Sequence, residues 1–267
     1  MVTIAKTKQP VRMPRFGHRA DKTDPIMRGC VGWWPLNDGA GTKAKDISGY
    51  GNDGTQSGGV SWASTAKGTA ASFDGVDDYF THASALSTSS TTYTVCGWFR
   101  RDAGSSGTIA SHRTATPILY QLDTNGTYPR MIVRDNSGNI VSVPATTPIT
   151  NGKWYFACGV RDGNSVYIYV NGVQEASGSA TFGTFTIAAT PEIGALYDGI
   201  ATGQFMDGNI QNVRIYDRAL TATEVSRLYN EPWAGLEPLS PFSFFSVPTA
   251  GAPLAVFYNH YKNQGII

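Results

Sequence analysis

The sequence has few charged residues and no long apolar run, and both absences exclude functional classes. Of its 267 residues 15% are charged, and the formal net charge is +1. This balance gives no whole-chain argument for binding nucleic acid or a membrane surface. No segment reaches the roughly 20 apolar residues of a membrane span, and the N-terminus lacks the apolar stretch of a secretory signal. We expect a soluble protein made in the cytoplasm, with neither a membrane nor a specific nucleic acid as partner.

Cysteine is scarce as well. The three cysteines, Cys30, Cys96 and Cys158, lie far apart, and the last two stand in apolar strand-like runs. Their odd number and the absence of any CxxC or Cys/His spacing argue against a disulfide framework and a zinc site. The sequence predicts buried free thiols.

The motifs of hydrolases are missing. Glycosidases on sandwich folds use two carboxylates about 5 to 10 Å apart. The five glutamates form no closely spaced acidic strand motif: they are Glu175, Glu192, Glu224, Glu231 and Glu237. The four histidines lie in unrelated contexts without a GxSxG elbow. We therefore expect no enzymatic activity and assign no catalytic residue.

Glycine and short β-type runs are abundant. Thirty glycines are present, and short apolar runs broken by turn residues fill residues 29–217. This pattern is typical of an antiparallel sandwich or barrel. The clearest hairpin is SVYIYVNGVQEAS, where Asn171 and Gly172 supply the two positive-φ residues of a type I′ turn.

A second group of strands predicts an antiparallel meander. PILYQLD, PRMIVRD and NIVSV are separated by glycine-containing turns. Within the first run, Tyr120 and Leu122 alternate with Gln121 and Asp123. The alternation predicts one apolar face and one face in contact with solvent.

Only one helix is expected. Thr221 and Glu224 form a capping-box pattern, and Val225 and Leu228 give a short apolar face before Pro232. The fold class is therefore all-β: a two-sheet antiparallel sandwich with one short C-terminal helix.

The two ends differ from the middle of the chain. Residues 1–28 carry seven basic and two acidic residues, and residues 231–267 carry five prolines and many aromatic side chains. We expect extended arms over 1–28 and 231–267 that flank a sandwich over 29–230. The candidate partner-binding residues are Arg12, Arg15, Arg19, Trp233, Phe242, Phe244 and Phe245.

Four segments resemble the concanavalin A-like, laminin-G-like jelly-roll family. They are GCVGWWPLNDGAGTKAKDISGYGNDGT, SFDGVDDYF, WYFACGVRDGNSVYIYVNGVQEASG and GNIQNVRIYDRALTATEVSRLY, and they cover about residues 29–229. The resemblance implies a jelly-roll sandwich. In SFDGVDDYF we expect Phe73 and Phe80 to be buried.

The acidic residues of SFDGVDDYF suggest a calcium site, because calcium takes several oxygen ligands. The resemblance implies a structural Ca²⁺ as cofactor. The candidate ligands are Asp46, Asn52, Asp74, Asp77 and Asp78. The alternative is that these side chains only form turns by bonding to nearby backbone groups. Gln211 and Asn212 stand where the family commonly has an acidic pair, which predicts weak affinity or none.

Two functions remain open. The stretch NEPWAGLEPL is similar to the ends of tailed-bacteriophage proteins. We therefore expect a virion structural protein, such as a capsid decoration, head-fibre or tail-associated subunit, whose arms bind other subunits in a homo-oligomer. The alternative is a carbohydrate-binding module, extracellular or at a cell surface, with Trp62, Tyr128 or Tyr197 as the sugar platform. A virion subunit that binds a host glycan combines both.

Overall fold

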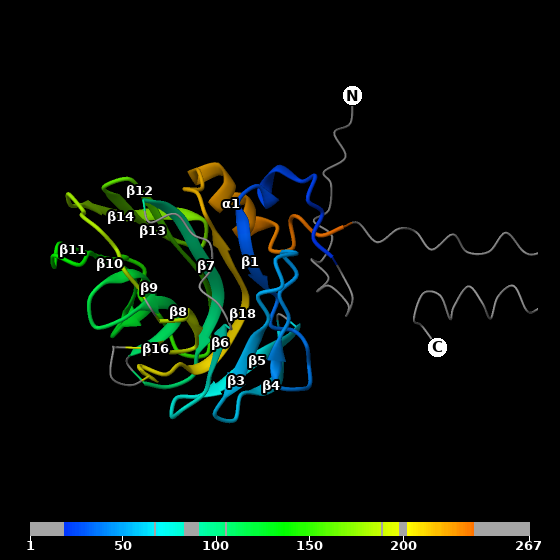
Figure 1. Ribbon diagram of the computed structural model, residues 1–267. Helices are drawn as coiled ribbons and strands as arrows, with labels where there is room; N and C mark the ends of the chain where they lie inside the picture. The colour runs from blue at the N-terminus through cyan, green and yellow to red at the C-terminus, as the bar shows by residue number, and fades with distance from the viewer. Residues whose placement is uncertain are drawn as a thin grey trace, which may run out of the picture. The chain divides into compact units, whose positions relative to one another are not determined.

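The computed structural model describes residues 19–66, 68–82, 91–104, 106–187, 189–197 and 202–237. Within them the chain folds as the predicted two-sheet antiparallel jelly-roll sandwich (Figure 1). The first sheet has eight strands, in the order β14 (Val173–Ser179), β13 (Ser165–Val170), β12 (Trp154–Asp162), β7 (Thr92–Arg101), β18 (Asp207–Tyr216), β5 (Gly68–Asp74) and β4 (Ser61–Thr65), with β1 (Cys30–Trp34) also paired to β18.

The second sheet also has eight strands. Their order is β11 (Ile140–Pro144), β10 (Tyr128–Arg134), β9 (Ile118–Asn125), β8 (Ser106–Arg113), β15 (Glu192–Ile193), β6 (Tyr79–His82), β3 (Gly54–Ser57) and β2 (Lys43–Ala44). A separate pair, β16 (Leu196–Tyr197) and β17 (Thr202–Gly203), follows β15 in the chain.

The first sheet is apolar on both faces. On β7, Tyr93, Val95 and Phe99 pack between the sheets, whereas Cys96 and Trp98 belong to a second apolar cluster on the opposite face. Side chains of a strand point alternately to opposite faces, so a continuous apolar run requires cover on both. The second sheet covers one face, and the terminal segments cover the other.

That terminal cover consists of the short helix η1 (Pro25–Met27), helix α1 (Ala222–Asn230) and residues 231–236, which lie together in Figure 1. Both Nη nitrogens of Arg227 donate to the Asp24 carboxylate at 2.7 Å. An isolated β-bridge joins Ala20 to Leu236. Residues 19–28 and 231–236 therefore pack with the sandwich, and residues 1–18 and 238–267 of the expected arms lie outside the described residues.

Local predictions are confirmed where they rest on turns and caps. Asn171 and Gly172 have φ values of 50° and 81° between β13 and β14. Thr221 and Glu224 make both hydrogen bonds of the capping box at the start of α1. All three cysteines are free and buried. Among the described residues, no helix combines the length and apolarity that crossing a membrane requires.

The expectation of a solvated face on β9 is wrong. Gln121 is 2% exposed and Asp123 is fully buried. Both point away from the space between the sheets, where Tyr120 and Leu122 pack. Strand alternation fixed the direction of these side chains, but it could not show that another part of the chain covers them.

Candidate functional site

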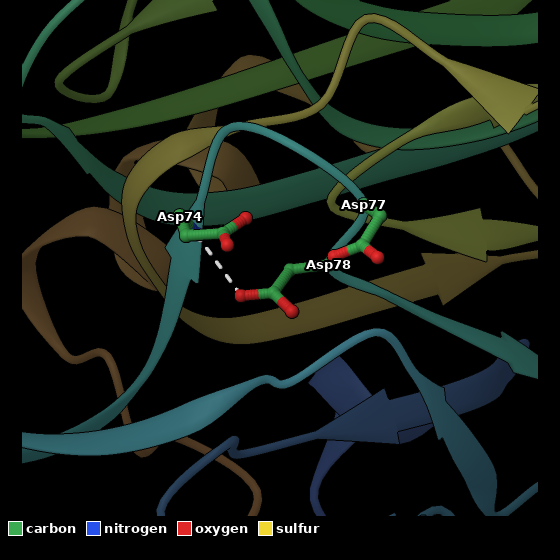
Figure 2. A group of neighbouring side chains, drawn as sticks. All are labelled: Asp74, Asp77 and Asp78. Carbon is green, nitrogen blue, oxygen red and sulfur yellow. Dashed lines mark hydrogen bonds between the residues drawn. The ribbon is translucent and has the colours of Figure 1, made fainter.

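The acidic loop joins β5 to β6. Asp74 ends β5, and Asp77 and Asp78 lead into β6 on the other side of the loop (Figure 2). One carboxylate oxygen from each residue lies within 4.8 Å of the other two. The structure thus brings together three of the five expected calcium ligands.

Asp78 holds this loop in shape. One of its oxygens accepts a hydrogen bond from the Asp74 N–H at 3.0 Å, and the other accepts one from the Gly59 N–H. Burial raises the pKa of Asp78. Gly58 has φ 72°, and a Cβ there would lie 2.5 Å from the Asp77 carbonyl oxygen, so only glycine fits. Asp78 therefore forms the turn that the alternative interpretation anticipated.

Asp74 and Asp77 are exposed and present their carboxylates to solvent. Asp74 accepts one bond from the Val76 N–H at 2.8 Å. Calcium takes six to eight oxygens, so water and carbonyl groups would have to supply the others. These oxygens suit a weakly bound Ca²⁺, and the calcium site remains a prediction.

Asp46 and Asn52 belong to a different network. Asp46 accepts hydrogen bonds from the backbone N–H groups of Trp33, Ser48 and Asn52 at 2.8 to 3.0 Å. The Asn52 amide donates to the Val31 carbonyl at 2.9 Å. Asp46 is not part of the carboxylate cluster, and both residues tie the glycine-rich loop to β1.

Gln211 and Asn212, which stand where the family commonly has an acidic pair, each donate a side-chain hydrogen bond to a backbone carbonyl. The Asn212 amide donates to the Pro232 carbonyl at 2.5 Å, and its oxygen accepts from the Trp33 indole at 2.7 Å. Gln211 donates to the Thr69 carbonyl at 2.7 Å. These contacts require a side chain that donates hydrogen bonds. An amide can both donate and accept, whereas a carboxylate only accepts.

A second polar region lies on the face of the second sheet that points away from the core. Thr81, Glu192, Ser111 and Gln121 are direct neighbours across β6, β15, β8 and β9. Ile193, next to Glu192, packs between the sheets, so Glu192 points outward. We call this region the outer polar face; its members are Thr81, Ser111, Gln121, Asp123, Arg130 and Glu192.

The charges on the outer polar face are arranged as a network. Arg130 donates twice to the Asp123 carboxylate, at 3.0 and 2.6 Å. Gln121 donates to the same carboxylate at 2.5 Å, and Arg113 donates to the Gln121 oxygen at 2.5 Å. The positive charge of Arg130 therefore compensates the negative charge of the Asp123 carboxylate.

Residues 194–197 and 202–205, here called the cover, lie over this face, and Met206 after them packs in the core between the sheets. Ser111 donates to the Ala195 carbonyl at 3.0 Å, and Gln121 donates to the Gln204 side-chain oxygen at 3.3 Å. Gln204 is exposed and has φ 46°. Non-glycine residues in this conformation are strained, and such strain clusters at functional sites. The cover explains why β9 is buried on both faces.

Glu192 is the acid that sequence reasoning did not single out. It is 6% exposed, one oxygen accepts from the Thr202 hydroxyl at 3.1 Å, and the other has no partner among the described residues. Burial raises its pKa to about 7. A lone glutamate inside the apolar stretch PEIGAL was the available signal, because a charged residue there must be neutralised or paired.

Aromatic side chains border the outer polar face. Tyr79 of β6 and Phe205 of the cover are both half-buried, with ring centroids 6.2 Å apart. Of the three rings expected as sugar platforms, Trp62 packs against the core, Tyr197 is half-buried in β16, and Tyr128 is 40% exposed. The Tyr79–Phe205 pair was missed, because the sequence does not show that residue 205 returns to β6.

The expected partner-binding residues are only partly described. Arg19 is exposed, and Trp233 is half-buried against the apolar cluster under α1. Arg12, Arg15, Phe242, Phe244 and Phe245 lie outside the described residues. Partner binding through both arms stays a prediction.

Comparisons with solved structures show the same fold in binding domains. The binding domain of Paraclostridial Mosquitocidal Protein 1 aligns at TM-score 0.65 and 13% identity, over 78% of this chain and 53% of that one. The Botulinum Neurotoxin Type G receptor binding domain aligns at 0.55 and 17%, over 75% and 51%. This chain thus spans about half the length of these toxin domains.

A third structure matches over nearly its whole length. It is Domain 4 of AbnA, a GH43 extracellular arabinanase from Geobacillus stearothermophilus, in complex with arabinotriose, which aligns at TM-score 0.58 and 20% identity over 75% of this chain and 98% of that one. No curated protein matches the sequence.

One family pattern matches most of the sandwich. It is described as Laminin G 3, of the concanavalin A-like lectin/glucanases superfamily, and it covers residues 74–226. That range contains the acidic loop, the outer polar face and the first half of α1. This chain belongs to the concanavalin A-like lectin/glucanase superfamily.

Proposed function

We propose that this protein is a non-catalytic, lectin-like module that binds carbohydrate at the border of the outer polar face. The observation that carries the proposal is the half-buried Tyr79–Phe205 ring pair beside the exposed Gln204 side chain, whose oxygen is held by Gln121. Ligand sites combine apolar or aromatic surface with a few fixed polar groups. Sugars offer both apolar ring faces and hydroxyl groups to such a surface.

The related folds support a binding role. The AbnA domain was solved with arabinotriose, and the toxin domains are described as binding or receptor-binding domains. A glycosidase needs one carboxyl that donates a proton and a second carboxylate beside it. In the acidic loop both Asp78 oxygens accept backbone hydrogen bonds, which argues against Asp78 as a proton donor.

The test is a glycan array with the full-length protein, followed by titration of the best binder. Tyr79→Ala and Phe205→Ala should each weaken binding about 10-fold or more, since losing a central aromatic contact costs over 1 kcal/mol. Tyr50→Ala is the control, because Tyr50 is 62% exposed on another loop. Equal effects of all three substitutions, or no glycan binding, would contradict the proposal.

A second proposal is a structural role in a virion, as a capsid decoration, head-fibre or tail-associated subunit. The observation that favours it is the pairing of the terminal segments: the Asp21 N–H donates to the Gly235 carbonyl at 2.7 Å, next to the Ala20–Leu236 bridge. Both flanking sequences therefore start from one place on the sandwich, where they can reach the same neighbouring subunit.

Incorporation into particles tests this role. Deleting residues 1–18 or 238–267 should abolish incorporation while the melting temperature of the sandwich is kept. Normal incorporation of both truncated proteins would contradict it. The two proposals are compatible if the anchored sandwich binds a host glycan.

A further inference from the structure

Gln204 is an exposed residue whose backbone is fixed from both sides. The Thr108 N–H of β8 donates to the Gln204 carbonyl at 3.0 Å, and the Met206 N–H donates to the Gly194 carbonyl at 2.8 Å. Met206 is fully buried between the sheets. These contacts hold Gln204 at its φ of 46°, so its side chain starts from a defined point on the cover.

The side-chain hydrogen bonds that lead to Gln204 run in one direction. Arginine can only donate, and an ionised aspartate can only accept. Arg113 donates to the Gln121 side-chain oxygen at 2.5 Å, so the Gln121 amide nitrogen faces away from Arg113. That nitrogen donates to the Asp123 carboxylate at 2.5 Å and to the Gln204 side-chain oxygen at 3.3 Å. Arg130, which donates twice to Asp123, holds the carboxylate in place.

The amide nitrogen of Gln204 is the outward end of this network. The oxygen of Gln204 accepts from Gln121, and its nitrogen has no hydrogen-bond partner among the described residues. Exchanging the two atoms would set two N–H donors against each other. Gln204 therefore offers donor hydrogens to a ligand, next to the Tyr79–Phe205 ring pair.

The charges that lie free beside the ring pair are negative. Asp77 is exposed two residues before Tyr79, and Asp74 is exposed on the same loop. The two arginines of the outer polar face are bound to Gln121 and Asp123. An anionic ligand on the rings would be repelled by the acidic loop, whereas a neutral ligand would not.

We propose that Gln204 is the specificity-determining residue of the carbohydrate site: its amide donates to an acceptor oxygen of a neutral saccharide that packs on Tyr79 and Phe205. This inference rests on the proposed function, because it names the ligand class of the same site. A site with a fixed donor rejects a ligand that lacks the matching acceptor, because the donor is then left unpaired.

The direction of the amide can be measured without a ligand. Gln121 is 2% exposed and its NH₂ group is hydrogen-bonded, whereas the NH₂ group of Gln204 faces solvent. In ¹⁵N NMR the Gln204 side-chain protons should exchange with water like those of a free glutamine, and the Gln121 protons at least about 10-fold more slowly. Gln204→Glu identifies the Gln204 signals by removing them. Equally slow exchange at both residues would overturn the proposal.

The second measurement is the affinity for the best neutral binder on the glycan array, in the presence of a calcium chelator. Gln204→Glu keeps the oxygen that accepts from Gln121 and replaces the donor by an acceptor, so it should weaken binding about 10- to 100-fold. Gln204→Ala removes the donor without adding an acceptor and should weaken binding only about 3- to 10-fold. A carboxylated counterpart of the same glycan should bind the wild type at least about 10-fold more weakly.

Gln174→Glu is the matched control. Gln174 is exposed on β14 of the other sheet, and its side-chain oxygen accepts from the Tyr169 hydroxyl at 3.1 Å. The substitution therefore makes the same chemical change at an equally exposed, hydrogen-bonded glutamine. It should bind glycan as the wild type does.

The outcomes separate this inference from the proposed function. If Tyr79→Ala weakens binding and Gln204→Glu does so no more than Gln204→Ala, the directed donor is overturned and the carbohydrate site stands. Tighter binding of the carboxylated glycan overturns the neutral ligand class. Absence of binding to every glycan overturns both the inference and the proposed function.

Discussion

Arg214 is the side chain whose loss should most directly detach the C-terminal segment from the sandwich. It is 1% exposed, and its guanidinium donates to the carbonyls of Pro232 and Ala234 at 2.6 and 2.8 Å. The guanidinium carbon also lies 3.6 Å from the ring centroid of Trp33. One cation thus joins β18, β1 and residues 232–234.

Arg214→Met keeps an apolar side chain of similar length and removes the charge and the hydrogen bonds. Hydrogen bonds from charged groups contribute about 1.5 to 3 kcal/mol each, and a desolvated cation–π contact about 2 kcal/mol. Relief of the buried charge offsets part of that loss. We expect the free energy of unfolding to fall by about 2 to 4 kcal/mol, or roughly 5 to 15 °C in melting temperature.

Calorimetry and chymotrypsin cleavage after Trp233 would check this expectation, because release of residues 231–237 exposes that bond. Arg214→Lys should behave like the methionine variant, since lysine lacks the planar fork that reaches two carbonyls. Arg100→Met, which breaks a partly exposed pair with Asp102 at 2.8 Å, should cost under about 1 kcal/mol. Arg214→Met melting within about 1 °C of the wild type would refute the reasoning.

Three further predictions concern carboxylates. The Arg218 guanidinium lowers the pKa of Glu224 to about 2. The ionised Glu224 therefore stabilises the fold above pH 4.5, and this contribution is lost as the pH falls from 4.5 to 2. Glu224→Gln should lower the free energy of unfolding in urea by about 1 to 2 kcal/mol at pH 7 and leave it unchanged at low pH. Glu175→Ala removes the acceptor of four hydrogen bonds from two threonines and should cost about 1 to 3 kcal/mol by the same assay. Asp77→Asn should abolish any rise in melting temperature with excess calcium and leave the melt in chelator unchanged, whereas Asp78→Ala should lower that melt.

Features encoded over a few neighbouring residues could be predicted from the sequence. The type I′ turn at Asn171 and Gly172 requires two positive φ values, and the capping box at Thr221 needs only a partner three residues on. Alternation along a strand likewise gave the inward direction of Tyr120. These choices are made by backbone sterics and hydrogen bonds within the segment.

The acidic loop was predictable only in part. Asp74, Asp77 and Asp78 are near neighbours in sequence, so their proximity follows from one turn. Asp46 and Asn52 could have been brought to them only by the arrangement of loops, and the structure instead uses both to fix β1. Distant ligand sets depend on loop placement, which composition does not encode.

The sequence by itself determined the strands and turns quoted for the hairpin and the meander, the helix α1 and the burial of the cysteines. Only the tertiary structure decided which polar residues are covered: Gln121 and Glu192 became buried because residues 194–197 and 202–205 return across β8 and β9. Likewise, both Nη groups of Arg214 found their acceptors in residues 232 and 234, whereas its Nε donates within its own strand, to Asn212 at 3.4 Å. Local sterics choose a side chain's direction, but the neighbour that it meets there is chosen by the packing of the whole chain, and that neighbour sets its charge state and its function.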